Sequence, residues 1–328
     1  MYAIHRILVA IKDPGVRAIP AIAKAAQLAR ALGAEVRLFH AIPEPIYLDI
    51  AQLDSASLAQ LEQRQSRAYQ RRLEALAQGL RRRGLEVTTA VTWDYPAHEA
   101  VIRAAEHFEA DLIVVDSHRS AHLVPWLLHF TDWELLRMSR VPVLLVKNRK
   151  PYRRPRVLAA VDPGHAFAKP RDLDDEILRF ADTLAQRLRG TLHAAYAFNP
   201  LPPQLQPSRA ASRAEPGRVQ REAAARAHAE LAPKLNLLRI PRARRHVIAG
   251  FAVDVIQHVA DDTRADIVVM GAVARSGLKR LLLGNTAERM LDRLNCDVLI
   301  VKPREFRSPV ARRPRGAQII AATPLPGY

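Results

Sequence analysis

The chain contains two diverged copies of one segment, and this internal repeat constrains its fold more than any other feature. Residues 93–149 align with residues 248–304 without a gap, at a constant offset of 155 positions (248 − 93 = 155). The beginnings also correspond, because Arg6–Ile11 matches Arg156–Val161 at an offset of 150 (156 − 6 = 150). Both copies end in nearly identical apolar runs, Val143–Lys147 and Val298–Lys302. Self-similarity of this kind indicates two domains of one architecture in tandem.

The length and composition agree with two domains. A chain of 328 residues of which 49% are hydrophobic can bury two separate cores. The polar, proline-bearing stretch around Pro151 predicts an exposed linker. We therefore expect an N-terminal domain over residues 1–150, a C-terminal domain over 151–305 and a basic tail over 306–328. The tail has no counterpart in the repeat.

Within each copy, short runs of Val, Ile and Leu alternate with longer segments of helical period. Strands that are apolar on both faces are typical of a parallel sheet covered by helices on both sides. Because crossovers are right-handed, the pattern predicts two tandem doubly wound α/β domains, each with a five-stranded parallel sheet. Strands are expected near 5–11, 35–42, 85–92, 111–116 and 142–147, and near 156–161, 191–197, 243–248, 266–270 and 297–302. Helices are expected near 17–32, 55–82, 97–108 and 132–139, and near 172–188, 218–232, 253–263 and 285–294.

The net charge of +17 predicts association with polyanions at low salt. The basic residues are spread over the predicted helices, so solvated helix faces explain the charge more simply than a nucleic-acid groove does. Aromatic residues make up 5% of the chain, too few for a base-stacking platform. Direct nucleic-acid association through the arginine excess stays open as an alternative.

Other features of the composition favour a cytoplasmic protein without membrane insertion. The chain has no run of eighteen apolar residues, and its first ten residues are typical of a β-strand rather than a signal peptide. The single cysteine, Cys296, cannot form an internal disulfide, which favours a reducing compartment. Cys296 precedes an apolar strand, so we expect a small buried side chain.

The segment after the fourth strand of copy two has the features of an anion site. It contains Gly271, Gly277 and Gly284, and Asn285 and Thr286 stand where the next helix is predicted to begin. Glycines let a backbone approach a phosphate closely, and a helix N-terminus offers N–H donors. In doubly wound sheets, ligands bind beyond the carboxyl ends of the strands, where strand order reverses. The segment therefore predicts an anionic ligand, although glycines that merely permit a tight turn remain an alternative.

The same segment resembles the nucleotide loop of the universal stress protein family. In the ATP-binding members, a glycine, two residues, a second glycine, nine residues and a glycine followed by serine or threonine hold the ribose and phosphates. Gly271 and Gly284 match the outer glycines, whereas Ala274 replaces the middle glycine and Asn285 replaces the hydroxyl residue. Asp162, at the end of the first strand of copy two, resembles the family's adenine-contacting aspartate. The likeness covers essentially the whole chain and is closest to a tandem-domain subfamily.

The resemblance implies a stress-response regulator that binds ATP or another adenine nucleotide in its C-terminal domain. The residues it implicates are Asp162, Gly271, Ala274, Gly277, Gly284, Asn285 and Thr286. Ala274 weakens the case for ATP itself, because a methyl group restricts the backbone where the family has glycine. In copy one, Lys12 and Asp116 occupy the positions of Asp162 and Gly271, so we expect no ordinary ATP binding there. Family members pair through their last strands, which implies an intramolecular pseudo-dimer and leaves a homodimer open.

Catalytic motifs are missing from the sequence. It contains no Gly-x-Ser-x-Gly elbow, no complete Walker loop and no His-Glu-x-x-His pattern. We therefore expect no dedicated enzyme, at most slow ATP hydrolysis, and no metal site. A second hypothesis is a carrier or sensor of a partly apolar small molecule in a repurposed C-terminal pocket. The proline-rich segment 199–217, which is expected to be a long irregular loop, could cover such a pocket.

Overall fold

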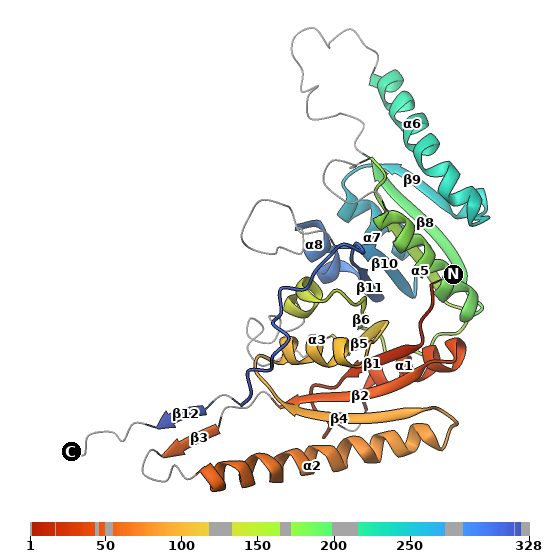
Figure 1. Cartoon of the computed structure of the whole chain (residues 1–328). Helices are drawn as coiled ribbons and strands as arrows, with labels where there is room; N and C mark the ends of the chain where they lie inside the picture. The colour runs from red at the N-terminus through yellow and green to blue at the C-terminus, as the bar shows by residue number, and fades with distance from the viewer. Residues whose placement is uncertain are drawn as a thin grey trace. The chain divides into compact units, whose positions relative to one another are not determined.

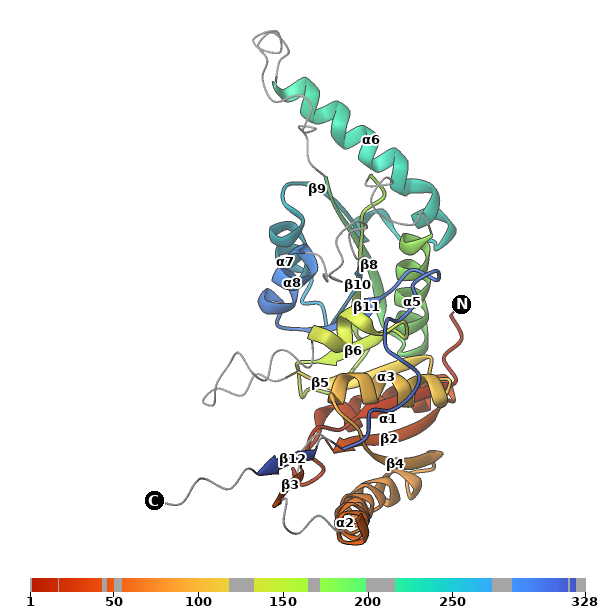
Figure 2. The same cartoon turned by 60° about the vertical axis from the view of Figure 1, so that its left-hand side comes forward.

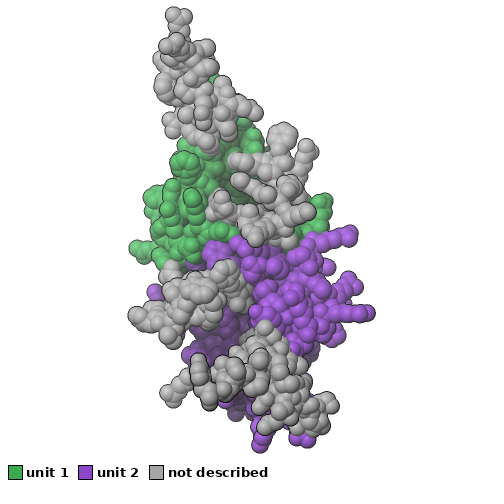
Figure 3. All heavy atoms as spheres, turned by 90° about the vertical axis from the view of Figure 1, so that its left-hand side faces the viewer, with its two compact units in different colours: residues 1–2, 152–306 green, residues 3–151, 307–328 purple. Residues whose placement is uncertain are grey.

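The structure, a computed structural model, describes residues 2–16, 18–42, 46–49, 55–117, 133–164, 172–198, 216–272, 285–317 and 319–322. Its contacts divide the chain into two compact units, which Figure 3 colours separately. The N-terminal unit, purple in Figure 3, comprises residues 3–151 and 307–328. The C-terminal unit, green, comprises residues 1–2 and 152–306. Each unit thus includes a segment from the opposite end of the chain.

The N-terminal unit is a parallel five-stranded sheet in the order β4-β2-β1-β5-β6 (Figure 1). Its strands are β1 (Arg6–Ala10), β2 (Glu35–Ile42), β4 (Val87–Trp93), β5 (Leu112–Asp116) and β6 (Val143–Val146). The helices that pack on it are α1 (Pro20–Leu32), α2 (Ser55–Arg81) and α3 (Ala97–His107). Residues 133–138 are also helical.

The C-terminal unit repeats this plan in the order β11-β10-β7-β8-β9. Its strands are β7 (Arg156–Val161), β8 (Thr191–Phe198), β9 (Arg245–Ala249), β10 (Ile267–Gly271) and β11 (Asp297–Val301). Its helices are α5 (Leu173–Arg187), α6 (Pro216–Leu237), α7 (Ala252–Asp262) and α8 (Asn285–Arg293). Helices α5 and α6 lie on one side of the sheet, and α7 and α8 lie on the other (Figure 2). The predicted pair of doubly wound parallel sheets is confirmed.

Local sequence explains where the elements begin and end. Helix α1 starts with Pro20, which fits the first turn because its missing N–H needs no partner there. It ends at Gly33 in the left-handed region (φ 71°), whose N–H donates to Ala29 O at 2.8 Å. The central strands are continuously apolar because helices cover both faces of each sheet. Accordingly, Ile267–Met270 of β10, a strand with a neighbour on each side, are all buried.

Three features of the fold differ from the sequence-based expectation. Two short strands, β3 (Ile46–Asp49) and β12 (Ile319–Ala322), form a separate parallel pair within the N-terminal unit. Figures 1 and 2 both draw them side by side. Helix α6 begins at Pro216, which the prediction placed in the proline-rich loop, and it continues past Pro233. The rest of that loop, residues 199–215, lies outside the described residues.

Candidate functional site

The strand order of the C-terminal sheet reverses between β7 and β10. From β7 the chain adds β8 and then β9 on one side, and β10 returns to the other side of β7. The register pairs Ala160 with Met270, so Asp162 and Gly271 lie at the carboxyl ends of neighbouring strands. Such a switch point is where doubly wound sheets bind their ligands. The structure therefore brings together two of the residues singled out in the sequence.

Asp162 is anchored by the helix that follows it. Its backbone N–H donates to Asp174 Oδ1 at 3.1 Å, and the Asp174 side chain is buried. Asp174, Asp175 and Glu176 form the acidic first turn of α5. Carboxylates there stabilise the helix, because the N-terminal end carries partial positive charge. The position of Asp162 is thus tied to the start of α5.

Tyr196 on β8 is a further residue of this edge, and sequence reasoning missed it. The Gly164 backbone hydrogen-bonds to the Tyr196 hydroxyl, and a Cβ on Gly164 would lie 2.4 Å from that oxygen. An alanine at this position would therefore have to displace the hydroxyl end of Tyr196. Burial, together with the charges of Asp162 and Glu230, raises the pKa of Tyr196 to about 12. The turn-like Asp-Pro-Gly sequence that follows β7 was the available signal.

Gly271 has a packing role that needs no ligand. A Cβ at this position would lie 2.7 Å from Leu173 Cδ2 and 3.1 Å from Ile177 Cδ1, both on α5. Close contact between α5 and β10 therefore accounts for the glycine by itself. The other predicted loop residues, Ala274, Gly277 and Gly284, lie outside the described residues. Asn285 and Thr286 open α8, as the sequence predicted.

The corresponding edge of the N-terminal unit is different. Asp116, at the position of Gly271, ends β5, and its Oδ1 accepts a hydrogen bond from Ala21 N at 2.8 Å. Ala21 lies in the first turn of α1, so a carboxylate occupies the helix N-terminus. A phosphate at this edge would meet that negative charge. That copy one does not bind ATP in the usual way stays a prediction, and the Asp116 carboxylate is a physical reason for it.

A basic groove lies along α2. It is a cavity of about 830 Å³ lined, among the described residues, by Gln60, Leu61, Gln63, Arg64, Arg67, Gln70 and Arg71. Arg64, Arg67 and Arg71 are exposed and share one helix face, at spacings of three and four residues. We call this surface the α2 groove.

Two further features of the described residues bear on the kind of site. They contain no group of three or more His, Cys, Asp or Glu side chains placed to hold a metal ion. Within the same part of the chain, no helix is both long and apolar enough to cross a membrane. Cys296 is buried, as the sequence predicted.

Several known proteins are similar to this chain over most of its length. The chain is 26% identical to Universal stress protein E of Salmonella typhi over 317 residues, which cover 94% of this chain and 98% of the relative. It is 31% identical to the Universal stress protein E homolog of Haemophilus influenzae over 224 residues, 67% of this chain and 71% of the relative. The crystal structure of a protein of unknown function from Pseudomonas aeruginosa PAO1 superposes with a TM-score of 0.71. It is 27% identical and covers 92% of this chain and 94% of its own.

The family description "Universal stress protein family" matches residues 3–147 and again residues 154–302. The two matches coincide with the two copies of the repeat and with the two parallel sheets. The chain therefore belongs to the universal stress protein family and carries two of its domains in tandem.

Proposed function

We propose that the chain is a non-catalytic stress-response regulator whose C-terminal unit binds an adenine nucleotide or a related phosphate-bearing ligand. The observation that carries this proposal is the meeting of Asp162 and Gly271 at adjacent strand ends, where strand order reverses. Helix α8 begins directly after the glycine-bearing segment, as an anion site requires. Membership in a family whose ATP-binding members use this loop supports the same function.

Charge suggests how such a ligand would lie. Asp162, Asp174 and Glu230 all act on the Tyr196 hydroxyl, so the β7–β8 side of the edge is acidic. Phosphates would be repelled there, whereas the amino group of adenine or a ribose hydroxyl could donate to the Asp162 carboxylate. The N-terminus of α8 favours negative charge. We therefore propose the base and ribose near Asp162 and the phosphates toward α8.

Isothermal titration of the full chain with ATP and with AMP tests this proposal. We expect one site per chain, because Asp116 makes the other edge unsuitable. Asp162→Ala should weaken binding about tenfold or more, which corresponds to ~1.4 kcal/mol. Asp182→Ala is the matched control, since Asp182 lies on α5 and contacts Gln186 instead. No heat from the native protein, or full affinity in Asp162→Ala, would contradict the proposal.

An exposed aromatic ring favours a second candidate, a partly apolar small molecule at the same edge. Phe251 is 80% exposed and caps the start of α7, just beyond the carboxyl end of β9. Native mass spectrometry of freshly purified protein would reveal a co-purified molecule. Phe251→Ser should reduce its occupancy, whereas Leu237→Ser, at an equally exposed residue that ends α6, should not. A chain that always emerges without a ligand would remove this candidate.

The α2 groove favours a third candidate, association with a phosphate-chain polyanion such as a nucleic acid. Arg64, Arg67 and Arg71 line the groove, and no ion pair holds them among the described residues. Binding of single-stranded DNA and of inorganic polyphosphate should fall steeply with salt. The double variant Arg67→Gln/Arg71→Gln should weaken binding. The slope of log affinity against log salt concentration should also become shallower by about 1.4, because two cations are lost. The control variant Arg82→Gln/Arg83→Gln has the same change in net charge and should weaken binding far less.

A further inference from the structure

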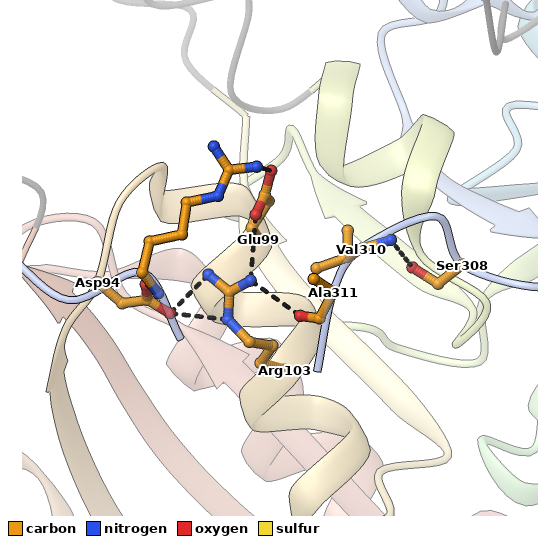
Figure 4. A network of polar contacts seen from close by, with 7 residues as sticks. Asp94, Glu99, Arg103, Ser308, Val310 and Ala311 are labelled. Carbon is orange, nitrogen blue, oxygen red and sulfur yellow. Dashed lines mark hydrogen bonds and ion pairs between the residues drawn. The ribbon is translucent and has the colours of Figure 1, made fainter. Parts of the chain in front are cut away.

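The N-terminal unit contains a compact ionic cluster at the carboxyl end of β4 (Figure 4). Asp94 directly follows β4, and Glu99 lies in the first turn of α3. Arg103, one turn further along α3, lies between them. Its Nη2 is 2.6 Å from Asp94 Oδ2, and its Nη1 is 3.1 Å from Glu99 Oε2. The three side chains are at most 10% exposed.

The segment that follows the C-terminal unit completes this cluster. The Arg315 backbone N–H donates to Asp94 Oδ1 at 2.9 Å, and Arg315 Nη2 donates to Glu99 Oε1 at 2.7 Å. Arg103 Nη1 donates in turn to Ala311 O at 3.1 Å. Figure 4 shows the tail backbone passing beside the cluster. Main-chain and side-chain groups of the tail are therefore both recognised.

The tail continues from the cluster into β12, which adds to β3 as a parallel strand. The register runs from Ile319 opposite Ile46 to Ala322 opposite Asp49. Strand β3 follows β2, and Asp94 follows β4, so both contacts lie beyond the carboxyl ends of neighbouring strands. Backbone pairing supplies affinity with little sequence preference, whereas the ionic cluster supplies selectivity.

Charge balance explains why the site needs an arginine. In the full chain two nearly buried carboxylates, Asp94 and Glu99, form ion pairs with two cations among the described residues, Arg103 and, from the tail, Arg315. An uncompensated charge with little access to water is strongly unfavourable. Arg315 restores neutrality, and its planar guanidinium can contact Glu99 while its own N–H contacts Asp94.

The cluster is not a property of the repeat. At the offset of 155, Glu99 corresponds to Asp254 (99 + 155 = 254), which pairs with Arg293 of α8 at 2.5 Å. Both partners of that pair are well exposed. The position of Arg293 is Met138 in the first copy (293 − 155 = 138), and the position of Asp94 is Ala249 in the second (94 + 155 = 249). The N-terminal unit therefore lacks the arginine that its sister obtains from its own last helix.

From these observations we infer that Asp94, Glu99 and Arg103 form an arginine-recognition site for an extended basic peptide. Its resident ligand, among the described residues, is the chain's own tail at 311–317 and 319–322. The site is independent of nucleotide binding in the C-terminal unit. The carboxyl edge of the N-terminal unit thus acts as a peptide-docking surface, and the tail is its partner.

A binding experiment in trans tests the site directly. A chain that ends at Val310 is titrated with a labelled synthetic peptide covering residues 311–322. We expect saturable binding that an Arg315→Gln peptide loses by at least tenfold, whereas an Arg313→Gln peptide binds like the native one. Arg313 is exposed and makes no hydrogen bond or ion pair with another described residue. The full chain should bind no peptide, because its site is occupied.

Two further outcomes are decisive. Equal affinity of the Arg315→Gln and native peptides, or undiminished binding to a Glu99→Gln chain, would overturn the inference. If the shortened chain does not fold, hydrogen exchange in full-length variants replaces the titration. Arg315→Gln should then speed exchange at residues 319–322 at least tenfold relative to Arg313→Gln. Identical exchange in the two variants would equally overturn the inference.

Discussion

Two glycines at the carboxyl edge of the C-terminal sheet are closely approached by neighbouring side chains. Gly164 leaves room for the Tyr196 hydroxyl, and Gly271 leaves room for Leu173 and Ile177. The phosphate-binding role that the sequence suggests for Gly271 stays a prediction, and the structure adds a packing role. The local sequence pattern does not indicate this second role, because the contacting side chains belong to another element.

Replacing Gly271 by alanine should destabilise the C-terminal unit by about 1–3 kcal/mol, because the added methyl group would overlap the α5 side chains. Gly79 provides the contrast. It lies inside α2, and no atom lies within 4 Å of the point that an alanine Cβ would occupy, so Gly79→Ala should stabilise by ~0.5–1 kcal/mol. Urea unfolding of both variants measures the two signs. A neutral Gly271→Ala would contradict the packing account.

A buried tyrosine–carboxylate pair gives a second prediction. Tyr152 donates to Asp297 Oδ2 at 2.6 Å, and the Asp297 side chain is fully buried. Burial and the Asp297 charge raise the pKa of Tyr152 well above its ordinary value, so the hydroxyl stays protonated. Tyr152→Phe should cost about 1–3 kcal/mol, since it removes a hydrogen bond to a buried charged group. Denaturant unfolding should show no such loss for Tyr95→Phe, because Tyr95 is exposed.

Strands β8 and β9 carry a histidine pair that links stability to pH. His193 Nδ1 lies 3.2 Å from His246 Nε2, and the rings stack. Burial, then His246, Arg244 and Arg156, lowers the pKa of His193 to about 4. Burial also lowers the pKa of His246, although Asp262 opposes this. The folded state therefore favours the neutral rings.

Because these folded-state pKa values lie below the unfolded value of 6.5, the contribution to stability is complete above pH 6.5. It is lost as pH falls from 6.5 toward 4. If no water reached His193, its pKa change would contribute ~3 kcal/mol to the free energy of unfolding. Because the ring is only half-buried, solvent screening reduces this contribution to about 1–2 kcal/mol. Unfolding at pH 4.5 and 7.5 measures it. His193→Gln/His246→Gln should flatten the dependence, and the exposed control His258→Gln should not.

Elements with strong local patterns were predictable from the sequence, and those that depend on distant partners were not. Apolar runs such as Val298–Val301 are short and rich in β-branched residues, which favours buried parallel strands, so both sheets could be predicted from the sequence. Strands β3 and β12 are four residues long and pair across 273 positions (319 − 46 = 273), so their pairing cannot be predicted from local sequence. The edge residue Tyr196 was missed for the same reason. Its role depends on contact with Gly164, which follows a different strand, β7.

For the whole molecule, each chain end belongs to the unit formed by the opposite half. Tyr2 packs on Phe180 with ring centroids 4.6 Å apart, and its N–H donates to Thr183 Oγ1 at 2.8 Å. Tyr2→Ala should therefore destabilise the C-terminal unit, by about 1–2 kcal/mol. Hydrogen exchange resolved by unit measures it, with Tyr2→Phe as the control that keeps the ring. Faster exchange confined to residues 3–151 would contradict this assignment.

The exchange of chain ends also orders events during protein synthesis. A ribosome makes residues 3–151 first, yet the segment that neutralises Asp94 and Glu99 is among the last to emerge. The half that is translated first is thus the half that is completed last. A nascent chain stalled before Ala311 would hold an N-terminal sheet that already has its core but still carries an unbalanced acidic cluster.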